Sequence, residues 1–176
     1  GEGEPEVRGV ALDRDQAQLS VRHVPDRPGM AGALCSALAD AGISLDAIVQ
    51  SERQHRDGSR DISFIVKRED RAASDQALAP LLAQWPGAVL EDGPAIARVS
   101  AIGAGMPATA GTAGRMFRFL AEAGVNIELI ATSEIRTSCV VAESDGIKAL
   151  EAVHAGFQLG GSECHQAQGT ESPLEA

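Results

Sequence analysis

The sequence predicts an α+β fold built from two ferredoxin-like βαββαβ units, and three observations lead to this prediction. Apolar residues switch between the two-residue period of strands and the longer period of helices, in the order strand, helix, strand, strand, helix, strand. This order starts again near residue 97. Residues 28–51 also lie over residues 110–133 without a gap, at an offset of 82 positions. The split order is typical of an antiparallel sheet with two helices on one face, and here it occurs twice.

The elements of the first half are separated by turn residues and by changes of period. Residues 17–24 alternate as in a half-buried strand, and His23 falls on the polar side, where we expect solvent contact rather than catalysis. The helix at 28–41 repeats its apolar residues at three and four positions and stops at a glycine. The turn dipeptide Asp57-Gly58 precedes another strand. In order, we expect strands at 7–12 and 17–24, a helix at 28–41, strands at 43–49 and 61–66, a helix at 70–84 and a strand at 88–91.

The second half repeats these elements. We expect strands at 97–102, 125–131 and 135–142, helices at 111–123 and 146–157, and a last edge strand at 163–168. The polar tail offers little apolar surface to bury, so we expect it to be loose. The predicted boundaries are 16–93 for the first unit, 94–168 for the second and 169–176 for the tail.

Composition limits the function further. The chain has 176 residues and is 44% hydrophobic but only 3% aromatic, so Ala, Val, Leu and Ile must build the core. A net charge of −10 argues against nucleic acid and against an anionic membrane as partner, because phosphate neutralisation needs clustered Lys and Arg. No apolar run is long enough to cross a bilayer. The three widely spaced cysteines form no disulfide framework, which suits the cytoplasm.

The most informative stretch is 25–33, where a loop turns into the start of a helix. Asp26 is a good N-cap residue, Pro28 is expected at or just before the first helical position, and Gly29 lets another molecule approach the backbone. The free N–H groups of such a helix start bind carboxylates. The alternative is a tight capped turn that binds no ligand.

The repeat places a second helix start at residues 110–113, but the two starts differ. Ala108 and Ala110 stand where the first copy has Asp26 and Pro28, so the second copy lacks the carboxylate. Two helix starts with different chemistry indicate either two sites that are not equivalent, or one site and one structural remnant.

No catalytic residue, metal site or cofactor is predicted. The glycine-rich stretch 103–106 lacks the Gly-Lys-Ser/Thr that binds phosphates, and no parallel βαβ pattern with an acidic ribose partner follows it. Cys164 and His165 are adjacent rather than spaced as metal ligands are. No Ser/His/Asp order supports nucleophilic catalysis, which makes a small enzyme the weakest of the hypotheses.

Residues 24–29, followed by a helix whose end lies in the stretch 39–46, resemble an ACT domain. An ACT domain is a small βαββαβ module that binds amino acids. From about Gly9 to about Gly169 the chain is also similar to the regulatory region of aspartate kinases. The motifs that carry this second resemblance are LDAIVQ at 45–50, DISF at 61–64, VSAIGAGM at 99–106 and VNIELIATSEI at 125–135.

The resemblance implies an arrangement and a role. The first ACT unit is inserted in the second, so the N-terminal strand within residues 1–15 joins the sheet of the second unit. The chain resembles the separate β-type regulatory subunit of αβ-type aspartate kinases, which is not an enzyme by itself. Such a subunit forms a homodimer, accompanies the catalytic alpha subunit and binds threonine or lysine as feedback inhibitor of amino-acid biosynthesis.

The resemblance also implies the site residues. The threonine site takes Asp26, the backbone of Gly29, Met30 and Ala31, and Gln50, and the second unit closes it with Asn126 and Ile127, with Ala113 near. The positions that the family associates with the lysine response are Ser44, Leu45, Asp46, Ser133 and Glu134.

Two features of the chain depart from the family. Arg60 stands where a small hydroxyl residue is usual, and Ala108-Thr109-Ala110 replaces the usual Ser-His-Pro. These departures keep a second hypothesis open, in which the chain is a structural dimerisation module whose effector sites have decayed.

Overall fold

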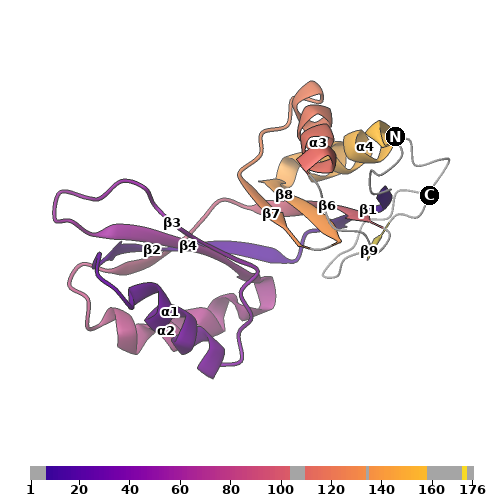
Figure 1. Ribbon diagram of the computed structural model, residues 1–176. Helices are drawn as coiled ribbons and strands as arrows, with labels where there is room; N and C mark the ends of the chain where they lie inside the picture. The colour runs from indigo at the N-terminus through magenta and orange to yellow at the C-terminus, as the bar shows by residue number, and fades with distance from the viewer. Residues whose placement is uncertain (1–6, 104–109, 134, 158–171, 174–176) are drawn as a thin grey trace. The chain divides into compact units, whose positions relative to one another are not determined.

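The computed structural model describes residues 7–103, 110–133, 135–157 and 172–173 (Figure 1). The chain divides into two compact units, and each is described by itself. The first unit is Gln16–Pro94, and the second unit combines Gly1–Asp15 with Ala95–Ala176. Residues 16–94 are therefore inserted between the first strand of the second unit and the rest of that unit.

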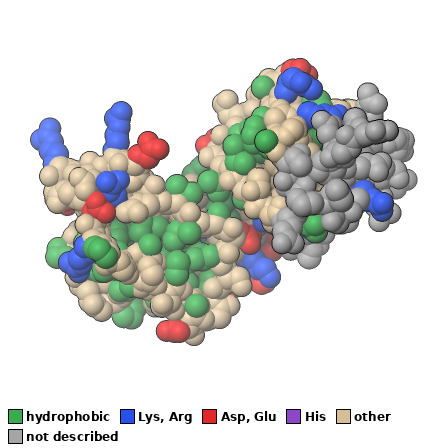
Figure 2. Space-filling model, viewed as in Figure 1, with side chains coloured by type: hydrophobic (Ala, Val, Ile, Leu, Met, Phe, Trp, Pro, Cys, Tyr) green, Lys and Arg blue, Asp and Glu red, His purple; other side chains and the backbone are tan. Residues whose placement is uncertain are grey.

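The first unit is a four-stranded antiparallel sheet with two helices on one face (Figure 1). Its elements are β2 (Gln16–Val24), α1 (Met30–Asp40), β3 (Ala47–Gln50), β4 (Arg60–Lys67), a short 3-10 helix η1 (Arg68–Asp70), α2 (Arg71–Leu82) and β5 (Val89–Asp92). The strand order is β3-β4-β2-β5. Leu19 and Phe64 pair across the sheet and pack with Leu38 of α1 and Leu78 of α2. Figure 2 shows hydrophobic side chains over α1, a helix whose exposed positions include Ala31 and Ala39.

The second unit repeats this architecture. Its elements are β1 (Val7–Asp13), β6 (Ile96–Gly103), α3 (Ala110–Glu122), β7 (Leu129–Thr132), β8 (Arg136–Ala142), a 3-10 helix η2 (Glu143–Asp145), α4 (Gly146–Gly156) and β9 (Ser172–Pro173). The strand order is β7-β8-β6-β1-β9, so β1 takes the place that β5 has in the first unit. Val10, Val99 and Cys139 of the sheet pack with Leu120 and Leu150 of the helices. The predicted fold class is confirmed.

Two predicted strands begin too early. The strands predicted at 43–49 and 125–131 start at Ala47 and Leu129. Ile43 and Val125 are each only 5% exposed, because they pack into the core below the sheet before the chain joins it. An apolar pattern identifies buried positions but not which of them form ladder hydrogen bonds.

The C-terminal predictions have mixed outcomes. The edge strand predicted at 163–168 lies outside the described residues. The tail predicted to be loose contains the short strand β9, whose Ser172 and Pro173 lie opposite Leu12 and Ala11 of β1. An unpaired sheet edge offers backbone hydrogen bonds even to a polar segment.

Two helical glycines should respond oppositely to alanine. A Cβ atom at Gly114 of α3 would meet nothing within 4 Å, so Gly114→Ala should raise the free energy of unfolding by about 0.5–1 kcal/mol through helix propensity. A Cβ atom at Gly156 of α4 would lie 2.4 Å from the Phe119 ring. Gly156→Ala should therefore lower the free energy of unfolding by about 1–3 kcal/mol. Urea denaturation of both variants measures the difference. Equal effects would contradict the packing of α3 on α4.

Candidate functional site

The start of α1 differs from the expected capped turn. Gly29, with φ 93° and ψ −8°, precedes the helix, and Pro28 lies just before it. Among the described residues no side chain caps this helix, so the prediction of Asp26 as N-cap is wrong. The N–H groups of the first turn, beginning at Met30, are thus left for water or a ligand. A left-handed residue here is inexpensive only for glycine.

A cavity of about 390 Å³ opens at this helix start. It is lined by residues 26–32 and by Gln50 at the end of β3. The structure therefore brings together five of the predicted site residues: Asp26, Gly29, Met30, Ala31 and Gln50. Asp26 is the single acidic residue in this described lining. The cavity offers helix-start N–H groups to an anion and a carboxylate to a cation.

Asp26 is engaged by two side chains from the β3–β4 loop and the start of β4. Its Oδ2 accepts a hydrogen bond of 2.8 Å from Arg60 Nε and one of 2.5 Å from Gln54 Nε2. The hydrogen bond from Arg60, followed by that from Gln54, holds the pKa of this carboxyl below its usual 3.8. Asp26 is therefore ionised at neutral pH and already faces a guanidinium.

The other predicted site residues of the first unit do not line the cavity. Ser44 and Asp46 are exposed in the connection from α1 to β3, where the Asp46 carboxylate accepts a hydrogen bond from the Gln16 side chain. Leu45 packs on the core of the first unit.

In the second unit, Ala113 is half-buried on α3 and Ile127 packs on the core of that unit. Asn126 and Ser133 are exposed. Glu134 lies outside the described residues.

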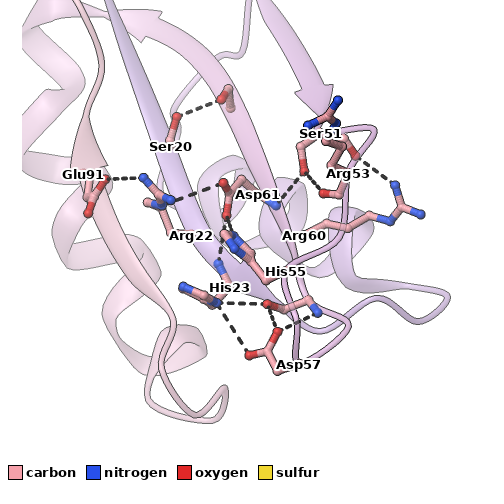
Figure 3. Close-up of polar contacts among 12 residues, drawn as sticks. Ser20, Arg22, His23, Ser51, Arg53, His55, Asp57, Arg60, Asp61 and Glu91 are labelled. Atoms are coloured by element: carbon pink, nitrogen blue, oxygen red, sulfur yellow. Dashed lines mark hydrogen bonds and ion pairs between the residues drawn. The ribbon is translucent and has the colours of Figure 1, made fainter.

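A cluster that the sequence did not indicate lies at one end of the first unit's sheet (Figure 3). We call His23, His55, Asp57, Ser59 and Asp61 the histidine cluster. The two imidazole rings stack with centroids 3.9 Å apart. His55 Nε2 lies 2.7 Å from Asp61 Oδ1, and His23 Nδ1 lies 3.0 Å from Ser59 Oγ.

His23 is half-buried, whereas the sequence predicts solvent contact. Strand β2 bulges at this residue, which has φ 60°. Alternation along β2 gave no signal for this bulge.

Acid should destabilise the first unit through this cluster. Burial raises the pKa of Asp61, but hydrogen bonds from His55 and from the His23 backbone N–H, with nearby positive charge, outweigh burial and lower it below 3.8. Because the folded pKa is the lower one, the unfolded state binds more protons, and the stabilisation is present above about pH 4 and lost as pH falls through the folded value. Asp61→Asn should cost about 1 kcal/mol at neutral pH.

Urea denaturation of both proteins between about pH 5 and pH 2 measures this effect. The wild type should lose stability steeply toward the acid end, and the difference from Asp61→Asn should disappear there. A difference that stays constant over the whole range would rule out ionisation of Asp61 as its cause.

The described residues contain neither a metal-binding cluster nor a membrane-spanning helix. No three His, Cys, Asp or Glu side chains in them are grouped so that they could hold a metal ion. None of their helices is both long and apolar enough to cross a membrane.

Comparisons with known proteins agree with this architecture. Residues 17–83 match an ACT domain model, and residues 99–157 match a second ACT domain model. The regulatory subunit of aspartate kinase from Thermus flavus is 39% identical, with a TM-score of 0.72 over 86% of this chain and 99% of that one. A crystal structure of aspartokinase alpha and beta subunits matches at 37% identity and a TM-score of 0.72, over 87% of this chain and 99% of that one.

Aspartokinase from Thermus thermophilus is 41% identical over 154 residues, which make up 87% of this chain but 38% of that protein. The two sheet-and-helix units and their matches define a tandem ACT-domain protein. More particularly, the chain belongs to the regulatory subunits and regions of aspartate kinases. In that family of transferases the catalytic domain is a separate region or chain.

Proposed function

We propose that this chain binds an amino-acid effector, threonine or lysine, at the start of α1 and thereby controls an aspartate kinase by feedback inhibition. The observation that carries the proposal is the cavity that joins the uncapped helix start to the carboxylate of Asp26. The effector's carboxylate would accept hydrogen bonds from the backbone of Met30 and Ala31, and its ammonium group would face Asp26. Gln50 would bind the threonine hydroxyl.

The remaining site residues would come from the second unit of a partner chain. Asn126 and Ile127 follow α3 at the positions that correspond in the repeat to Ser44 and Leu45. We propose that they close the cavity, with Ala113 beside them. Ser44, Leu45 and Asp46, together with Ser133 and Glu134, would form the part that responds to lysine.

Two unpaired sheet edges support a homodimer. In the described residues β3 and β7 lie at the edges of their sheets, and they correspond to each other in the repeat. Ile48 and Val49 of β3 are 40% and 43% exposed, and Ile130 of β7 is 48% exposed. An exposed apolar edge strand favours pairing with another chain. Pairing β3 of one protomer with β7 of its partner would place Gln50 next to that interface.

The proposed partners follow from the family. A solved relative contains aspartokinase alpha and beta subunits, so we propose that this chain accompanies a catalytic alpha subunit. We place the protein in the cytoplasm, where its widely spaced cysteines would stay reduced.

A second candidate function is a dimerisation module that no longer binds an effector. The observation that favours it is the hydrogen bond from Arg60 to Asp26, which already engages one oxygen of the carboxylate that an effector would use.

Calorimetric titration of the chain with threonine and with lysine separates the two functions. Under the effector proposal, at least one amino acid binds and raises the melting temperature, since a ligand of the folded state stabilises it. No heat and no thermal shift with either amino acid, in a chain that remains dimeric by sedimentation, would favour the module.

A further inference from the structure

Arg60 donates a hydrogen bond to the carboxylate that the ammonium group of an effector would use, although Arg60 itself does not line the cavity. Its Nε lies 2.8 Å from Asp26 Oδ2, and both side chains are partly shielded, at 26% and 30% exposed. We infer that Arg60 sets the affinity of the site, as an internal counter-ion with which the ammonium group of an incoming amino acid competes for Asp26. This inference rests on the proposed function and adds that the Arg60 guanidinium competes with the effector's ammonium group for Asp26.

Further hydrogen bonds fix the position of the Arg60 guanidinium. Arg60 Nη1 donates to the carbonyl oxygens of Ser51 at 3.0 Å and Glu52 at 2.5 Å. Ser51 is itself anchored on β4, because its N–H donates to the Asp61 carbonyl oxygen at 2.8 Å. The guanidinium is therefore positioned beside Asp26 by the fold, and a free amino acid must compete with a group that has little freedom left to lose.

The charges in the cavity lead to the same conclusion. Asp26 is the single acidic residue in the described lining, and Arg60 balances its charge locally. An ammonium group that enters while the pair is intact meets a neutral ion pair instead of a free carboxylate, and Arg27 in the lining adds another positive charge. Removing the charge of Arg60 should therefore strengthen binding. If Arg60 instead contacted the effector's carboxylate, removing its charge would weaken binding.

A series of variants that changes only this charge tests the inference. Arg60→Gln keeps donors for the loop carbonyls but loses the charge, whereas Arg60→Lys keeps the charge. The control is Arg71→Gln, because Arg71 is 27% exposed and also pairs with carboxylates, those of Asp75 and Asp92. Threonine and lysine are titrated into the full chain of each protein by calorimetry, and thermal melts verify the fold.

We expect Arg60→Gln to bind the effector about fivefold more tightly than the wild type, the upper range for an exposed ion pair. Arg60→Lys should stay within about twofold of the wild type, because it retains the counter-ion. Arg71→Gln should bind as the wild type does. If Arg60→Gln fails to fold, Arg60→Met, also long and uncharged, replaces it.

The outcomes distinguish failure of this inference from failure of the proposed function. Binding by Arg60→Gln but not by the wild type would support both. Wild-type binding that Arg60→Gln leaves unchanged or weakens would overturn the inference and leave the proposed function intact. If neither protein binds threonine or lysine, both fail.

Discussion

Replacing Asp26 with alanine is expected to abolish the thermal response to threonine and lysine without changing the oligomeric state. The variant removes the single carboxylate from the described cavity lining and leaves Arg27 and Arg60 near an incoming ammonium group. A charge-assisted hydrogen bond lost in this way should weaken binding by at least about tenfold. Differential scanning fluorimetry with each amino acid measures the response, and sedimentation measures assembly.

Asp92→Ala is the matched control for this prediction. Asp92 is also an acidic residue of the first unit whose carboxylate pairs with an arginine, Arg71, but it lies on β5 and does not line the cavity. Its variant should respond to effector as the wild type does. A threonine or lysine response that survives Asp26→Ala at full size would place the effector elsewhere and remove the main support for a site at the start of α1.

The internal repeat explains why so much of the fold could be predicted. An ungapped match between 28–51 and 110–133 assigns each helix start, helix and following strand twice, so an error in one copy is visible in the other. The approach of Gln50 to the 26–32 loop is implied by the resemblance to the regulatory region of aspartate kinases, which assigns Gln50 to the same site.

The partners of Asp26 could not be predicted in the same way. Arg60 is 34 positions away, and the two residues meet because Val24 lies opposite Arg60 in the β2–β4 register, after a bulge at His23. Alternation shows which face of a strand is buried but not how an irregular end is paired. Asp26 has the side chain of a good N-cap, yet an arginine from another strand provides a stronger partner than uncharged backbone N–H groups.

The largest expected change in stability comes from Phe64→Ala. Phe64 is 1% exposed on β4, an inner strand, and lies between Leu19 of β2 and Ile48 of β3. Truncating a buried phenylalanine costs about 3–5 kcal/mol, since transfer energy and cavity cost add together. Trp85, the chain's one tryptophan, is buried in the same core, so its fluorescence in a urea titration reports the loss directly. Ser63→Ala, which changes the neighbouring side chain on the other sheet face, should cost less than about 1.5 kcal/mol.

A second variant shows how far this loss extends along the chain. Leu120 is fully buried in the second unit, and the two hydrophobic cores share no residue among those described. Leu120→Ala should therefore destabilise the second unit, as measured by hydrogen exchange in α3 and α4, and leave the midpoint reported by Trp85 unchanged. If Leu120→Ala shifts the Trp85 midpoint as far as Phe64→Ala does, the units unfold as one cooperative body. A signal that starts at the start of α1 could then reach the second unit through folding stability alone.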